Sequence, residues 1–243
     1  LKQALNTNRI APAYIFSGPR GTGKTSSARI LARSLNCLKS DQATTDPCGE
    51  CNNCKTISQG TSLDVIEIDA ASNTGVDNIR ELIERARFSP VQARWKVYVI
   101  DECHMLSTAA FNALLKTLEE PPPQVVFILA TTDLQRVLPT ILSRCQSFDF
   151  RRIPLAKLIN HLEMIASKEA ISIEKSALDL VAQKAQGGLR DAESMLDQLS
   201  LLPKPIKINA VWDLLGAIPE QNLLKITNAL ANSDPIKLLE TCR

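Results

Sequence analysis

The sequence of 243 residues is long enough for one α/β domain and a smaller second domain, and with 44% hydrophobic and 22% charged residues it has the composition of a globular protein. Its short apolar runs exclude a membrane span, and its N-terminal stretch lacks the apolar core of a signal peptide, so we expect a cytoplasmic protein. The formal charge of +2 is too small to predict nucleic-acid binding, although it does not exclude it.

Strand and helix patterns alternate over the first part of the chain. Short apolar runs predict strands at 13–18, 63–70, 96–102, 125–132 and 146–150. Residues at helical spacing follow the first run, namely Ala28, Leu31, Leu35 and Leu38, and similar patterns follow the later runs. Strands that are apolar on both faces are typical of parallel sheets covered by helices. We therefore predict an α/β fold with a doubly wound parallel sheet.

The pattern changes after Pro154. Three helical stripes follow, over roughly 155–165, 176–186 and 189–200, with no convincing strand. We predict a small helical domain over 154–217 and a further helical segment over 218–243. Because the sequence does not begin with Met and ends within a helical pattern, we expect a fragment of a longer protein.

The segment GPRGTGKT, residues 18–25, matches the pattern G-x-x-x-x-G-K-[ST] between a predicted strand and a predicted helix. In that context backbone N–H groups and the helix N-terminus bind phosphates. Lys24 would reach the β- and γ-phosphates, and Thr25 would be a Mg²⁺ ligand. The predicted nucleotide-binding residues are Gly18, Gly21, Thr22, Gly23, Lys24, Thr25 and Ser26. A glycine-rich turn without a ligand is the simpler alternative, but the flanking strand and helix argue against it.

Asp101 and Glu102 end the apolar run at 96–102, and open α/β sheets bind ligands at that edge. Asp101 would hold Mg²⁺ through water. Glu102 would orient and deprotonate the attacking water, because phosphoryl transfer depends on positioning and charge stabilisation. A solvated pair of acidic residues is the alternative, which the phosphate loop in the same chain disfavours.

A cluster of cysteines follows the phosphate-loop helix. Cys48, Cys51 and Cys54 are spaced as C-x₂-C-x₂-C, and Cys37 lies upstream. Without a secretory signal, such clusters indicate metal ligands before disulfides. Four thiolates suit a structural Zn²⁺ ion. An iron–sulfur cluster or free thiols are the alternatives, although the next cysteine that a ferredoxin-like pattern requires is absent.

Further motifs follow in a fixed order: VIEIDAAS, IDECHMLSTAAFNALLKTLEEPP, LATTD, ILSRC and GGLRDAESMLDQ. Together with the phosphate loop and CGECNNC, they resemble the AAA+ ATPases and, more narrowly, the gamma/tau family of bacterial DNA polymerase III clamp-loader subunits. The resemblance covers about residues 10–200. It implies a nucleotide-binding domain over 1–153 with a zinc module at about 37–60, a helical lid over 154–217, and the start of a truncated helical collar over 218–243.

The resemblance also implies roles that residue type alone does not. Arg144, by itself most simply a surface arginine, matches the arginine finger that acts on ATP held by a neighbouring subunit. Arg190, which by itself has the same simple interpretation, matches the second sensor of the γ-phosphate. Thr132, in preference to Thr131, matches the first sensor. Together with Lys24 and Glu102, Arg144 completes the predicted catalytic set. The two histidines, His104 and His161, are not spaced as metal ligands and receive no role.

By this resemblance the chain would be an ATP-hydrolysing motor subunit within the DNA polymerase holoenzyme, with ATP, Mg²⁺ and Zn²⁺ as cofactors. Its partners would be other clamp-loader subunits, the sliding clamp and primed DNA, with no membrane. The alternative is a non-catalytic module like the delta-prime subunit, which shares the zinc module but has a degraded phosphate loop. The intact motif at residues 18–25 favours the motor.

Overall fold

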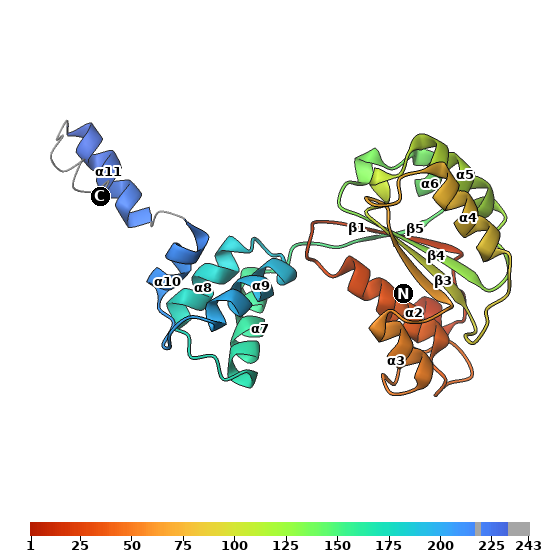
Figure 1. Ribbon diagram of the computed structural model, residues 1–243, viewed down its shortest axis with the longest axis horizontal. Coiled ribbons are helices and arrows are strands. Elements are labelled where there is room, and N and C mark those ends of the chain that lie inside the picture. The colour runs from red at the N-terminus through yellow and green to blue at the C-terminus, as the bar shows by residue number, and fades with distance from the viewer. Residues whose placement is uncertain (217–219, 233–243) are drawn as a thin grey trace. The chain divides into compact units, whose positions relative to one another are not determined.

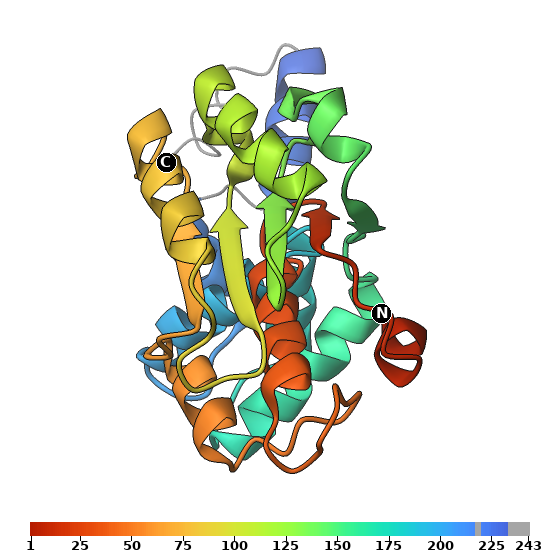
Figure 2. The ribbon, with the colours of Figure 1, turned by 90° about the vertical axis from the view of Figure 1, so that its right-hand side faces the viewer.

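The computed structural model describes residues 1–216 and 220–232, and the chain divides into two units, 1–152 and 153–243. The first unit is built on a five-stranded sheet in the order β2-β3-β4-β1-β5. Its strands are β1 (Ala13–Ser17), β2 (Val65–Asp69), β3 (Lys96–Asp101), β4 (Val125–Thr131) and β5 (Gln146–Asp149). All pair in parallel, side by side in Figure 2, which confirms the predicted parallel sheet.

Helices cover both faces of this sheet, as Figure 1 shows, with α2 and α3 on one side and α4, α5 and α6 on the other. The helices of this unit are α1 (Lys2–Asn6), α2 (Lys24–Asn36), α3 (Asn52–Gln59), α4 (Val76–Ala86), α5 (Thr108–Glu119) and α6 (Pro139–Leu142), with short 3₁₀ turns η1 (Cys103–Met105) and η2 (Leu134–Arg136). Helices of parallel sheets are placed this way by right-handed crossovers between strands. The sheet is therefore doubly wound, as predicted.

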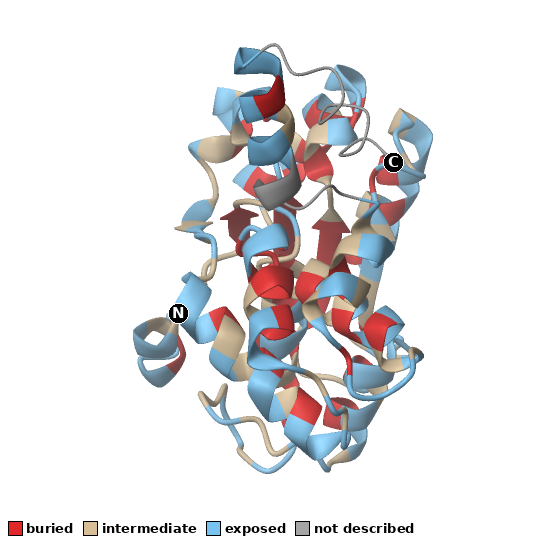
Figure 3. Ribbon diagram, turned by 90° about the vertical axis from the view of Figure 1, so that its left-hand side faces the viewer, coloured by how far each residue is buried: buried red, intermediate tan, exposed pale blue. Residues whose placement is uncertain are grey.

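Side-chain alternation along each strand builds two separate hydrophobic cores. In β1, Ala13 and Ile15 face α4 and α5, whereas Tyr14 and Phe16 face α2. The strands β3 and β4 alternate in the same way. Because both faces are buried, β1 and β4 are apolar at every position except their last residues, Ser17 and Thr131, and Figure 3 shows buried residues in the sheet and on the helices that cover it.

Local signals set several helix ends. Ser107 caps α5, because its Oγ accepts the N–H of Ala110 at 3.2 Å, and the helix ends at Glu119 before three prolines. Helix α2 is shorter than its apolar spacing suggests. It ends at Asn36, where Cys37 becomes extended, so Leu38 lies outside the helix and is exposed. The chain leaves the helix there because Cys37 turns toward the other cysteines.

The second unit is helical around its own core. It contains α7 (Leu155–Lys168), α8 (Lys175–Lys184), α9 (Leu189–Ser200) and α10 (Ile208–Leu215), followed by α11 (Glu220–Ala231). The core includes Leu158, Leu162, Val181 and Leu196, whereas Leu155, at the start of the first predicted stripe, is exposed. Of the segment 218–243, in which we expected the start of a collar, residues 218–219 and 233–243 lie outside the described residues.

No helix among residues 1–216 and 220–232 has both the length and the apolar character needed to cross a bilayer.

Candidate nucleotide and metal sites

The phosphate loop connects β1 to α2 at the carboxyl edge of the sheet. Gly23 takes a left-handed conformation, with φ of +90°, immediately before the first turn of α2. By helix geometry, the first N–H groups of α2, on Lys24, Thr25 and Ser26, have no acceptors within the helix. These donors and the positive end of the helix dipole suit a phosphate.

Gly18 is required by packing as well as by its φ of +143°. A Cβ atom at this position would lie 2.1 Å from the carbonyl oxygen of Phe150, a distance that real side chains do not adopt. Phe150 is held there because its N–H donates to the carbonyl of Ser17 at 2.7 Å. The first glycine of the loop therefore lets the end of β5 pass directly against it.

Lys24 is buried inside the loop, with 6% of its surface exposed. Its Nζ donates to the carbonyl oxygens of Gly18 and Pro19 at 2.8 and 2.9 Å. Burial lowers the pKa of Lys24, and the nearby charges of Glu102 and Asp101 oppose that shift. The ammonium group is thus already placed within the loop, and its carbonyl contacts are of a kind that phosphate oxygens can replace.

Thr25, at the start of α2, and Asp101, at the end of β3, are in direct contact. The Oγ1 of Thr25 donates to Oδ2 of Asp101 at 2.7 Å, and the N–H of Glu102 donates to Oδ1 at 2.9 Å. A hydroxyl and a carboxylate side by side are oxygen donors of the kind that Mg²⁺ prefers. The two predicted magnesium ligands therefore lie together and fit that ion, although they are 76 residues apart in the sequence.

Glu102 follows β3 in an unusual backbone conformation, with φ of +46°. Its Oε2 accepts the Oγ1–H of Thr132 at 2.9 Å and the N–H of Thr132 at 3.2 Å. Non-glycine residues with positive φ are uncommon, and they concentrate at functional sites. The geometry brings together Glu102 and Thr132 from neighbouring strands, whereas Thr131 is fully buried and bonds to Asp133.

His104, to which the sequence pattern assigned no role, lies at the same site. Its Nδ1 is 3.0 Å from Oγ1 of Thr131 and 3.4 Å from Oε2 of Glu102. The side chain is 11% exposed. Only its position two residues after Glu102 could have suggested this placement, because a single histidine has no ligand spacing to detect.

Arg144 lies between α6 and β5, and its guanidinium is held by acceptors of its own chain. It donates to the carbonyl of Thr140 at 2.7 Å and pairs with the carboxylate of Glu119. Arg190 belongs to the second unit, where it is exposed in the first turn of α9. Arg190 is thus exposed, whereas the side chain of Arg144 is half-buried and already paired.

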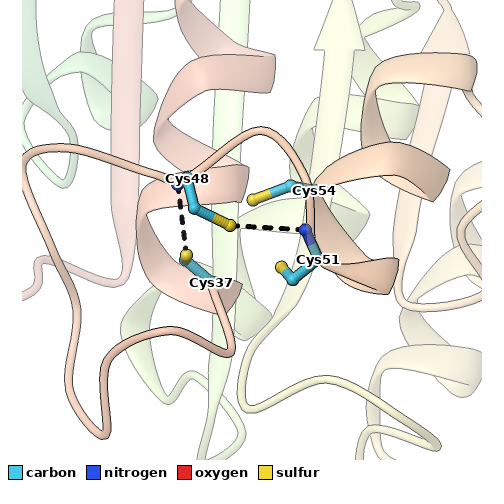
Figure 4. A group of neighbouring side chains, drawn as sticks. All are labelled: Cys37, Cys48, Cys51 and Cys54. Carbon is cyan, nitrogen blue, oxygen red and sulfur yellow. Dashed lines mark hydrogen bonds between the residues drawn. The ribbon is translucent and has the colours of Figure 1, made fainter.

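The four predicted zinc ligands come together in the first unit, as Figure 4 shows. The sulfur atoms of Cys37, Cys48, Cys51 and Cys54 all lie within 4.8 Å of one another. A tetrahedral Zn²⁺ with Zn–S bonds of about 2.3 Å needs sulfur atoms roughly 3.8 Å apart, so small movements suffice to form the site.

Hydrogen bonds in this cluster favour thiolates, whereas burial opposes them. The N–H of Cys51 donates to Sγ of Cys48 at 3.3 Å, and the N–H of Cys48 donates to Sγ of Cys37 at 3.4 Å. Backbone N–H groups of Cys51 and Glu50 lower the pKa of the Cys48 thiol to about 6, whereas burial raises that of Cys54 to about 12. A bound Zn²⁺ ion would supply the charge that keeps the buried Cys54 as a thiolate.

Polar side chains fix the cysteine module to the sheet. Asn36 exchanges two hydrogen bonds with the backbone of Trp95, just before β3, at 2.9 and 2.8 Å. Arg94 donates to the carbonyls of Cys37 and Ser40, and Asn53 donates to the carbonyl of Asn36. These residues could not be predicted from the sequence, because their partners lie far along the chain.

We expect the protein to bind one Zn²⁺ per chain, and Cys51→Ser to lose it and to loosen residues 38–60 far more than the nucleotide site. A closed four-thiolate site has no open position for catalysis, so its contribution is to local folding. Elemental analysis and limited proteolysis measure the two effects, with Cys145→Ser, outside the cluster, as the control that keeps its zinc. Protein purified without chelators that contains no zinc would contradict the prediction, as would a Cys51→Ser variant that folds normally and loses only ATP hydrolysis.

Comparison with known proteins places this site among replication proteins. A family model described as "DNA polymerase III, delta subunit" matches residues 1–154, and one described as "DNA polymerase III clamp loader subunit, ATPase lid domain" matches residues 157–199. Together the two models cover the first unit and the first part of the second.

Curated relatives agree over nearly the whole sequence. The chain is 46% identical to DNA polymerase III subunit tau of Bacillus subtilis over 99% of its length, covering 43% of that protein. It is 46% identical to subunit tau of Escherichia coli over 96% of its length, covering 36% of that protein. For DNA polymerase III subunit gamma of Buchnera aphidicola the identity is 45%, over 98% of the chain and 66% of the relative. The chain thus spans less than half the length of the first two relatives.

Among solved structures, the Thermotoga maritima RuvB Holliday junction branch migration motor aligns with a TM-score of 0.61 over 95% of this chain and 72% of that one. The sequence identity is 16%, so this likeness concerns the fold alone.

Proposed function

Because the chain belongs to the DNA polymerase III gamma/tau family of AAA+ clamp-loader subunits, we propose that it is the part of such a subunit that binds and hydrolyses ATP. The observation that carries this proposal is the complete phosphate site, in which Lys24 is buried within its loop and Thr25 contacts Asp101 at 2.7 Å. A delta-prime-like module without catalysis does not need these groups. The motor is therefore the better-supported function.

In this proposal each residue acts on a separate part of ATP. Lys24 exchanges its carbonyl contacts for the β- and γ-phosphates, and the first N–H groups of α2 bind the same phosphates. Thr25 and Asp101 hold Mg²⁺, which when bound neutralises the charge on the phosphates. Glu102 orients the attacking water and accepts its proton. Thr132 and Arg190 act as sensors of the γ-phosphate.

Arg144 completes the site of a neighbouring subunit. Its guanidinium would contribute to stabilising the charge that develops on the transferred phosphoryl group. Through this dependence on a neighbour, ATP binding would organise the subunits to open the sliding clamp and hold primed DNA, and hydrolysis would release the closed clamp. The test is to measure ATP hydrolysis by the full-length protein in its complex, with and without clamp and primed DNA. A rate that neither addition changes would contradict the loading role.

We expect Lys24→Ala to weaken ATP binding by about a hundredfold or more, because charge-assisted contacts to two phosphates are lost together. Equilibrium titration of the full-length protein with ATP measures this effect. The control is Lys184→Ala, since Lys184 lies in the second unit against the ring of Trp212. Unchanged ATP affinity in Lys24→Ala would favour the non-catalytic module.

A further inference from the structure

The two carboxylate oxygens of Glu102 have different surroundings. The backbone and side chain of Thr132 both donate to Oε2, and Nδ1 of His104 is 3.4 Å from the same oxygen. Among the described residues, Oε1 has no hydrogen-bond partner. One oxygen of the base is thus anchored, and the other is left for a water molecule.

The contacts of Thr131 indicate which ring nitrogen of His104 carries a proton. The single hydroxyl proton of Thr131 is directed to the carbonyl of Asp133 at 3.0 Å, and the same oxygen accepts the N–H of Asp133. Toward His104, Thr131 therefore offers a lone pair. Nδ1 is therefore the nitrogen that holds the hydrogen, which it donates to Oγ1 of Thr131 at 3.0 Å, while Oε2 of Glu102 lies 3.4 Å from the same nitrogen as an electrostatic contact.

We propose that His104 is a positioning residue for ATP hydrolysis, which holds Oε2 of Glu102 so that Oε1 faces the attacking water. This inference rests on the proposed role of Glu102 as the base. The side chain of His104 is 11% exposed and fixed by fully buried Thr131, whereas that of Glu102 is 31% exposed. The N–H group of His104, fixed by Thr131, thus lies beside Oε2 and attracts a carboxylate that would otherwise turn toward solvent.

The test compares His104→Leu, which removes the donor, with His104→Asn, whose side-chain amide can place an N–H close to the position of Nδ1. In the full-length protein assembled in its complex, we expect His104→Leu to slow single-turnover hydrolysis of bound ATP about tenfold, with ATP affinity unchanged. His104→Asn should recover most of the rate. The control is His161→Leu, because His161 pairs with Glu193 in the second unit. This variant should hydrolyse ATP at the native rate.

A double variant separates positioning from general damage to the fold. In a Glu102→Gln background, adding His104→Leu should leave the small residual rate unchanged, because the group that His104 positions is already absent. Three results would each overturn the inference. They are a further tenfold loss in the double variant, a native rate in the single variant His104→Leu, and a His104→Asn variant that is as slow as His104→Leu. If Glu102→Gln hydrolyses ATP at the native rate, the proposed base is wrong. If Glu102→Gln is inactive but His104→Leu hydrolyses ATP at the native rate, only the positioning role of His104 is wrong.

Discussion

In an assembled complex, Arg144→Ala is expected to slow ATP hydrolysis at the adjacent subunit by about 10³–10⁵-fold, the range measured for arginine fingers in related NTPases. The ATP affinity of the variant's own site should stay nearly unchanged, because Arg144 is bound to Thr140 and Glu119 and forms no hydrogen bond or ion pair with the phosphate loop among the described residues. An isolated chain should bind ATP and hydrolyse it very slowly, with or without this arginine.

The experiment places Arg144→Ala and Lys24→Ala protomers in defined neighbouring positions and measures hydrolysis at each interface. Arg85→Ala is the control, because Arg85, like Arg144, is an arginine paired with a carboxylate, here that of Glu81 on α4. It should leave the neighbouring rate within about twofold, since exposed ion pairs contribute little. If the lost activity follows the ATP bound to the Arg144→Ala protomer itself, Arg144 acts in cis and the assignment fails.

Glu102→Gln is expected to keep ATP binding and to lose turnover by about 10²–10⁴-fold, the contribution typical of a general base. Glutamine has the size of glutamate and retains an oxygen that can accept from Thr132, so the fold and the Mg²⁺ residues Thr25 and Asp101 are preserved. Equilibrium binding and single-turnover hydrolysis measure the two effects separately. Glu120→Gln, at an exposed carboxylate with no ion pair among the described residues, is the control. Hydrolysis at the native rate by Glu102→Gln in the assembled complex would show that another group accepts the proton.

The phosphate loop, the acidic pair and the four cysteines could be predicted from the sequence because each depends on local spacing. A strand, a G-x-x-x-x-G-K-[ST] turn and a helix are consecutive, so their order along the chain already places Lys24 at a helix N-terminus. The central strands β1, β3 and β4 were recognisable because both of their faces are buried and largely apolar, whereas β2 and β5 are partly exposed. The resemblance to the clamp-loader family, confirmed over nearly the whole chain, came from the same local motifs.

Only the tertiary structure decided which side chains meet across the sheet. Because β3 lies beside β4, Glu102 contacts Thr132, and the alternation of side chains along β4 buries Thr131 against His104 instead. The anchoring of the cysteine module also depends on such distant contacts, since Asn36 and Trp95 are 59 residues apart. Spacing within one element determines periodicity and local motifs. It carries no information on which element becomes the neighbour, because strand order results from how the whole chain buries its two cores.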